Sequence, residues 1–221
     1  QVTLRFNTRA GSTLEDENAK KDEGMKDLQI VLYRRVNGEY TYYNKYDHVV
    51  PEGENGRTTV DLGDVQLGDY LFYVVANGAS AGLTVEEGGM TEAALRGHIM
   101  RNGAFPAAAP PTSLPMAGSK QVIVNQERVT DSIKVVRAVA RLDIELENVT
   151  GDEIRVERIP FGAFGADRAY LFGQGGENEV MPDEVTCKEF EIPGKNEAIA
   201  TGGKANYVYY IYPSAAGAGA Y

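Results

Sequence analysis

The sequence has no tryptophan, two histidines and a single cysteine among its 221 residues. A lone cysteine, Cys187, cannot form a disulfide within the chain, so the cysteine count does not indicate a cellular compartment. His48 and His98 stand outside any zinc-binding spacing such as HExxH, and we expect no metal and no cofactor. A Walker phosphate loop is also missing. We therefore expect that the protein is not an enzyme.

Long apolar runs and an excess of basic residues are missing as well. No segment approaches the roughly 18 consecutive apolar residues of a membrane span, so we expect no transmembrane segment in this chain. Asp and Glu total 32 against 22 for Lys and Arg, which gives a formal net charge of −10. A surface of this charge repels phosphate backbones, and we expect no nucleic-acid partner. The first residues show no charged n-region or apolar h-region, so we expect that any export signal has been removed or left out of this sequence.

What the sequence does contain favours β-structure, beginning with 13 tyrosines and 25 glycines. Val2, Leu4 and Phe6 alternate with polar residues and predict a half-buried strand. Residues 69–76 are apolar on both faces and predict a central strand. Asn37 and Gly38 predict a tight hairpin, because both residue types tolerate a positive φ.

The most regular alternation covers residues 136–146. Six apolar residues occupy every second position, and most of the residues between them are charged. This pattern predicts one long strand whose even-numbered side chains face a core.

A helix and a long connection divide the chain. Residues 91–102 predict the single helix, with Thr91 as its N-cap. Residues 103–118 are rich in alanine and proline, which predicts an irregular connection. Together the patterns predict an all-β fold of two β-sandwich domains, residues 1–131 and 132–221, with one short peripheral helix.

The order of several segments resembles the fimbrillin family, the subunits of type V pili in Bacteroidetes. Residues 114–118 read LPMAG, and an arginine-containing strand follows at 136–144. Before them come the strand VTLRF, a polar loop, a strand at 28–33 and the run LGDYLFYVVANG. The resemblance implies two transthyretin-like β-sandwich domains, export as a lipoprotein, and a location at the cell surface, in the fimbrium or outer membrane.

The resemblance also implies a processing step. Stalk subunits of the family lose their first strand to an arginine-specific protease, and a strand of another subunit fills the groove. Arg9 and Ala10 directly follow the first strand and lie in a polar loop. They correspond to the cleavage site, and Val2, Leu4 and Phe6 to the exchangeable first strand. An ordinary loop arginine at position 9 is the alternative.

Two features depart from the family pattern. The lipid-carrying cysteine of the family is not present in this chain. Residues 132–221 supply four or five predicted strands, whereas a closed sandwich has about seven. Either the second domain is incomplete here, or it is shorter in this member.

These observations favour a fimbrial subunit or pilus-associated surface protein that assembles by β-strand exchange and has a role in adhesion. The expected partners are other pilus subunits, through strand addition, and a host protein or glycan. The alternative is an exported β-sandwich module that binds carbohydrate or host protein. Tyr40, Tyr42, Tyr43 and Tyr46 could stack on sugars, although cross-strand packing in a hairpin explains them equally well.

Overall fold

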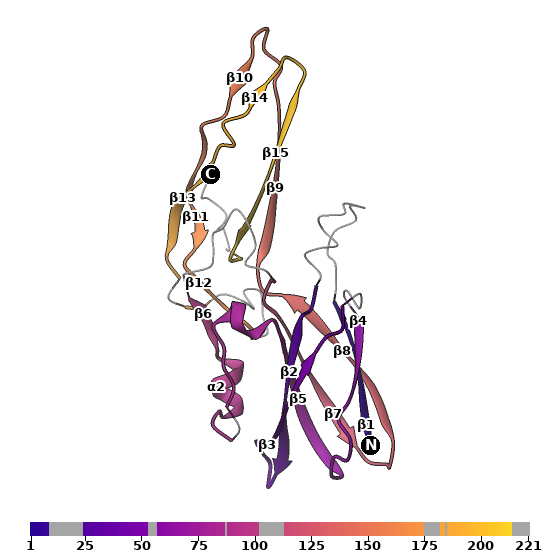
Figure 1. Cartoon of the computed structure of the whole chain (residues 1–221). Helices are drawn as coiled ribbons and strands as arrows, with labels where there is room; N and C mark the ends of the chain where they lie inside the picture. The colour runs from indigo at the N-terminus through magenta and orange to yellow at the C-terminus, as the bar shows by residue number, and fades with distance from the viewer. Residues whose placement is uncertain are drawn as a thin grey trace. The chain divides into compact units, whose positions relative to one another are not determined.

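The computed structural model of the chain is almost entirely β-structure (Figure 1). It describes residues 1–8, 24–52, 57–86, 88–101, 113–174, 182–183 and 185–213. The chain forms two compact units. The first comprises Gln1–Met100, Thr112–Ala138 and Tyr170–Val180, and the second comprises Arg101–Pro111, Val139–Ala169 and Met181–Tyr221. The all-β fold class predicted from the sequence is confirmed, while the division into domains after residue 131 stays a prediction.

The first unit is built on a seven-stranded sheet with the order β3-β2-β5-β7-β8-β1-β4. The strands are β1 (Val2–Thr8), β2 (Asp27–Val36), β3 (Glu39–Val49), β4 (Arg57–Asp61), β5 (Gly68–Ala76), β7 (Met116–Val124) and β8 (Val129–Arg137). β8 changes partner along its length: it pairs with β1 up to Val135 and with β7 only at Val136 and Arg137. The sheet therefore curls at β8 into two layers, and one buried cluster takes side chains from both.

The crossing of β7 and β8 depends on a glycine. A Cβ added to Gly118 would lie 2.1 Å from the carbonyl oxygen of Lys134, so only glycine allows this approach. Farther along the two strands, the Lys120 ammonium donates to the Asp131 carboxylate and to the Ser132 carbonyl, the latter at 3.1 Å. Side-chain contacts thus link the strands where their backbones diverge.

β5 is buried on both faces, as its apolar pattern predicts. One face, with Tyr70 and Phe72, belongs to the main buried cluster. On the other face, the Tyr73 ring packs edge-on against Tyr33 and Phe172, with centroids 5.9 and 5.0 Å apart. The prediction of a central strand is therefore confirmed.

The predicted hairpin joins β2 and β3. Asn37 and Gly38 form its turn with φ values of 52° and 94°, both in the left-handed region. The pairing shifts between Leu32 and Tyr33, which marks a bulge. The turn dipeptide therefore identified the correct pair of strands.

The helix and the connection after it are shorter than expected. The α-helix among the described residues, α2 (Glu92–Arg96), starts at its predicted N-cap, since the Thr91 hydroxyl accepts from the Ala94 N–H at 3.2 Å. Gly97 ends it, and the chain continues as β6 (Ile99–Arg101). The irregular connection expected to residue 118 is wrong over its last three residues, because β7 begins at Met116. A short 3-10 helix, η1 (Gly78–Ala81), follows β5.

The described residues of the second unit form three pairs of antiparallel strands. They are β9 (Ala140–Glu147) with β15 (Lys204–Ile211), β11 (Arg158–Ala166) with β13 (Cys187–Pro193), and β10 (Ile154–Arg155) with β14 (Ala198–Ile199). β12 (Arg168–Tyr170) follows β11. Phe161, Phe190 and Tyr209 stack in a column, with successive centroids 4.7 and 5.5 Å apart. Aromatic packing from three strands therefore forms much of this unit's centre.

The single long strand expected over 136–146 is wrong, because β8 and β9 are separate strands in different units. In β8 the odd-numbered Val135 is buried, whereas the side chain of Val136 has an exposed fraction of 47%. In β9 the even-numbered side chains pack on the centre of the second unit, as predicted. The alternation changes at Ala138 and Val139, which are consecutive and both buried; the Ala138 N–H donates to the Pro115 carbonyl at 2.9 Å, in register with the β7–β8 pairing.

Candidate functional site

β1 is an interior strand of the first unit, with hydrogen-bonded neighbours along both edges (Figure 1). On one side it runs parallel to β8, from Val2 opposite Val129 to Thr8 opposite Val135. On the other side it runs antiparallel to β4. Removal of β1 would therefore expose backbone hydrogen-bonding groups on two strands at once.

The apolar side chains of β1 lie in the core. Val2, Leu4 and Phe6 each have an exposed fraction of 0% and belong to the main buried cluster. Arg5 and Asn7, on the opposite face, are exposed. The half-buried strand predicted from the alternation is confirmed. Each such side chain contributes about 1.5–3 kcal/mol when fully buried, so β1 is a substantial part of this core.

The start of β1 is held by the end of β4, by Gly63 just after it, and by the start of β8. Val2 N donates to the Gly63 carbonyl at 3.0 Å, and Val129 N donates to the Gln1 carbonyl at 3.0 Å. The Gln1 side-chain amide also donates to the Asp61 carboxylate. Hydrogen bonds from the Gly63 N–H and then the Gln1 amide hold the pKa of the Asp61 carboxyl below its usual value.

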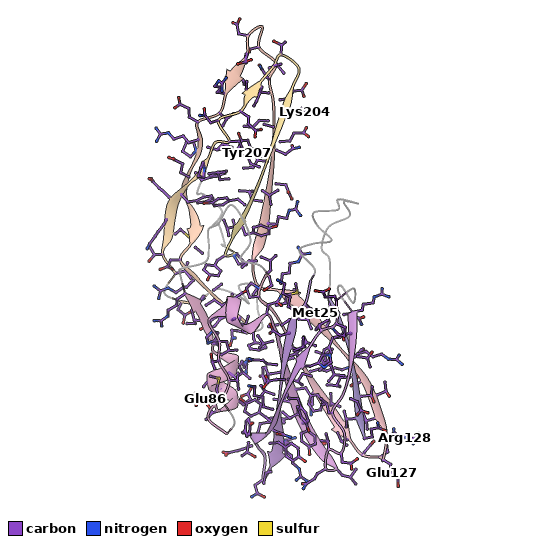
Figure 2. All side chains as sticks on the ribbon, in the orientation of Figure 1. Met25, Glu86, Glu127, Arg128, Lys204 and Tyr207 are labelled. Atoms are coloured by element: carbon purple, nitrogen blue, oxygen red, sulfur yellow. The ribbon has the colours of Figure 1, made fainter. Side chains whose placement is uncertain are left out.

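Arg9 and Ala10 lie outside the described residues, so the expected cleavage site stays a prediction. β1 ends at Thr8, and the description resumes at residue 24. Met25, labelled in Figure 2, has an exposed fraction of 4% and belongs to the same cluster as Phe6. The core therefore contains residues from both sides of segment 9–23.

A buried asparagine at the end of β5 connects separate chain segments at this end of the unit. Asn77 has an exposed fraction of 1% and a left-handed backbone, with φ 58° and ψ 46°. Its Nδ2 donates to the carbonyls of Gly24 (3.1 Å) and Leu114 (2.7 Å), and its Oδ1 accepts from Lys26 N (2.9 Å). Sequence reasoning missed this residue. An Asn-Gly pair directly after the apolar run of residues 70–76 was the signal that could have found it.

The face of β2 and β5 opposite the main cluster is covered by α2 and Phe172. The Tyr33 hydroxyl donates to the Met90 carbonyl at 3.0 Å, and the Tyr73 hydroxyl donates to the Glu92 carboxylate. Burial, followed by the nearby Glu92 charge, raises the pKa of Tyr33 to about 12. These tyrosines are structural hydrogen-bond donors.

The four tyrosines considered for sugar stacking are divided between two faces of β3. Tyr43 and Tyr46 pack against the main buried cluster, and the Tyr43 ring lies edge-on to Tyr70 at 5.2 Å. Tyr42 instead lies edge-on to Tyr33 at 6.2 Å. Packing within the unit therefore accounts for three of the four, with Tyr40 at the end of the hairpin.

The residues considered for metal or thiol chemistry are dispersed. The His98 ring lies with Nε2 3.1 Å from the Ala81 carbonyl oxygen, and Cys187 is half-buried at the start of β13. Across the described parts of the chain, no three His, Cys, Asp or Glu side chains gather in an arrangement that could hold a metal ion. In those same parts, none of the helices has the length and apolar character needed to cross a bilayer.

A curled seven-stranded sheet followed by a second β unit defines a β-sandwich protein of two units. The sequence profile of the family described as Major fimbrial subunit protein (FimA) matches residues 1–137. This match covers more than half of the chain, and the chain belongs to the major fimbrial subunit (FimA) family. The resemblance to fimbrillins is thereby confirmed. Members of this family are surface-associated pilus components.

Solved structures share the fold at low sequence identity. A candidate cell adhesion protein from Parabacteroides distasonis is 12% identical with a TM-score of 0.64, and the alignment covers 98% of this chain and 71% of that one. A candidate adhesin from Bacteroides thetaiotaomicron is 11% identical with a TM-score of 0.59, over 99% and 72%. The tip fimbrial protein Mfa3 from Porphyromonas gingivalis, with a C-terminal truncation, is 14% identical with a TM-score of 0.57, over 98% and 70%. No curated protein matches the chain.

Proposed function

We propose that this chain is a fimbrial subunit or pilus-associated surface protein that assembles by exchange of β1 and has a role in adhesion. Family membership supports the pilus class. The observation that carries strand exchange is the placement of β1, with three fully buried side chains between β8 and β4. After cleavage at Arg9, non-covalent contacts alone would hold this strand.

Covalent attachment decides whether β1 can be replaced. While β1 is part of the chain, its effective concentration at the groove between β8 and β4 is far higher than that of any competing strand. The uncleaved chain therefore stays closed. Once cleaved, β1 competes as a separate peptide, and a strand of another pilus subunit takes its place by strand addition.

The groove defines the chemistry of the incoming strand. It offers the backbone groups of β8 and β4 and the apolar surface that Val2, Leu4 and Phe6 cover. The replacement is therefore an extended segment with apolar side chains at alternate positions and polar ones between them.

We propose further that the two compact units are the two domains of the subunit. The expected location is the cell surface, in the fimbrium or attached to the outer membrane as a lipoprotein. Family membership supports this location. A non-enzymatic role accords with the dispersal of the histidines and the cysteine.

The experiment compares the wild-type chain with Arg9→Ala under an arginine-specific protease. Mass spectrometry locates the cuts, and size-exclusion chromatography measures assembly. We expect the wild type to be cut after Arg9 and to form oligomers, and Arg9→Ala to stay monomeric. Oligomers of Arg9→Ala that retain residues 2–6 would refute the proposal.

A peptide competition tests the groove directly. A labelled synthetic peptide of residues 1–9 should enter the cleaved protein and, in excess, block its assembly. The same peptide with Leu4→Asp is the matched control. It should not bind, because the groove would bury an uncompensated charge. A cleaved protein that takes up neither peptide, or both equally, contradicts strand exchange.

A further inference from the structure

Asn77 lies at the end of the first unit where β1 ends. Thr8 of β1 is opposite Val135, and the next two residues of β8 pair with the start of β7. The start of β7 also pairs with Ala76, the residue directly before Asn77. The end of β1, the start of β7 and the end of β5 therefore meet at one end of this unit.

The Asn77 side chain binds segments that lie outside the strands, although the Lys26 carbonyl also accepts from Val50 N at 2.9 Å. Residues 24–26 and Leu114 lie outside the strands, and three of their backbone groups bond to the Asn77 carboxamide. These segments carry Met25 and lead into Met116, whose exposed fractions are 4% and 0%. Both methionines belong to the cluster that contains Phe6. The carboxamide therefore positions part of the wall around the buried face of β1.

We propose that Asn77 is a positioning residue for strand exchange: it keeps the groove in its receptive shape while β1 is absent. This inference rests on the proposed exchange of β1. In the closed chain, Phe6 packs in the same cluster and supports these segments from within. In the open groove that support is lost, and the hydrogen bonds of Asn77 remain. Loss of the carboxamide should therefore affect the open state more than the closed one.

Position 77 requires a residue that tolerates a left-handed backbone and whose side chain both donates and accepts hydrogen bonds, and asparagine meets both requirements. Glycine accepts the left-handed backbone but offers no hydrogen bonds. Aspartate could accept from Lys26 N, but its carboxylate would face the Gly24 and Leu114 carbonyl oxygens without a proton to donate. Asn77→Gly consequently removes the three side-chain bonds without straining the backbone, and it is the informative variant.

Two matched controls separate the candidate role from general effects of the substitution. Asn37→Gly makes the same change at an exposed left-handed residue in the β2–β3 turn. Asn148→Gly removes a buried carboxamide from the second unit. Asn148 has an exposed fraction of 1% and donates to the carbonyls of Asp152 and Ile199 at 2.9 and 2.7 Å. Neither control touches the segments around the groove.

The experiment uses the chain cleaved after Arg9 and freed of its own β1, together with the labelled peptide of residues 1–9. Fluorescence anisotropy gives the association rate and the affinity of the peptide, and hydrogen exchange in urea gives the stability of each uncleaved variant. We expect Asn77→Gly to slow association of the peptide about tenfold or more, because only the receptive fraction of the open groove can bind and each lost buried hydrogen bond lowers that fraction by a factor of several. The two controls should bind within about twofold of wild type, as distant sites do.

The experiment separates a failure of the proposed role of Asn77 from a failure of strand exchange itself. A wild-type association rate in Asn77→Gly overturns the role of Asn77. If the wild-type chain takes up no peptide, strand exchange fails. Hydrogen exchange across residues 24–28 then decides the role of Asn77. A larger rise in exchange on removal of β1 in Asn77→Gly than in wild type supports it, and an equal rise overturns it.

Discussion

The contribution of β1 to the first unit can be measured by shortening one side chain. Phe6 has an exposed fraction of 0% in the main buried cluster. Truncating a buried phenylalanine to alanine lowers the free energy of unfolding by about 3–5 kcal/mol, because burial is lost and the cavity refills only partly. Arg5→Ala, on the exposed face of the same strand, should change it by less than about 0.5 kcal/mol.

Hydrogen exchange followed by mass spectrometry suits this comparison, because the two units need not unfold together. In Phe6→Ala, the amides of β8 and β4 that pair with β1 should lose protection at lower urea concentration than in wild type. Peptides from β9 and β15 provide an internal reference within the same sample.

The same substitution should act on strand binding once the chain is cleaved. A loss of about 3–5 kcal/mol corresponds to roughly two to four orders of magnitude in affinity, since each 1.4 kcal/mol is tenfold. Wild-type peptide should therefore displace the Phe6→Ala strand readily, while an Arg5→Ala strand is displaced no faster than wild type. If Phe6→Ala behaves like Arg5→Ala in both assays, the core does not depend on β1 and the reasoning is refuted.

Three further predictions concern the rest of the structure. Gly118→Ala should destabilise the first unit by about 2 kcal/mol or more in urea unfolding, because a Cβ there meets the Lys134 carbonyl at 2.1 Å; unchanged stability would show that β7 moves away freely. Leu142→Asp should lower the free energy of unfolding of the second unit by about 2–4 kcal/mol. Asp143→Ala, on the exposed face of β9, should change that free energy by about 1 kcal/mol at most. Equal effects of the two substitutions would contradict the register of β9. Burial raises the pKa of Tyr33 to about 12, so the folded state holds this proton more tightly than the unfolded chain does. The free energy of unfolding should therefore fall as the pH rises from about 10 to 12. Urea melts at each pH should show a smaller fall in Tyr33→Phe.

Local alternation was sufficient to predict the buried face of β1, because a half-buried strand needs only a period of two. It did not reveal the neighbours of β1. The pairing of Val2 with Val129 joins residues far apart in the sequence, and no local pattern specifies such a register. The interior position of the strand, on which strand exchange depends, therefore required the structure.

The same alternation gave a wrong answer over 136–146 for a physical reason. Val136 is an exposed apolar side chain, and it keeps the period of two running across a break between two strands. Buried and exposed apolar residues look identical in a sequence, so the change of phase at Ala138 was hidden. The helix was overextended because Gly97, tolerated within a helical pattern, ends α2.

The connectivity of the sheet adds a last prediction about cleavage itself. β2 and β3 are joined by a two-residue turn, so each strand is tethered to its own hydrogen-bonded neighbour. β1 differs, because the next strand in sequence, β2, is separated from it in the sheet by β5, β7 and β8. A cut after Arg9 therefore severs no connection between paired strands.

Cleavage alone should consequently leave every ladder intact. Before any competitor is added, we expect the cleaved chain with its β1 still bound to show the same hydrogen-exchange protection in β4 and β8 as the intact chain, under conditions that favour folding. Protection should fall only when the bound strand is diluted away or displaced, because ladder bonds and three buried side chains hold it. Immediate loss of protection in β8 on cleavage would show that attachment through segment 9–23 stabilises β1 more than its own contacts do, and exchange would then need no competing strand at all.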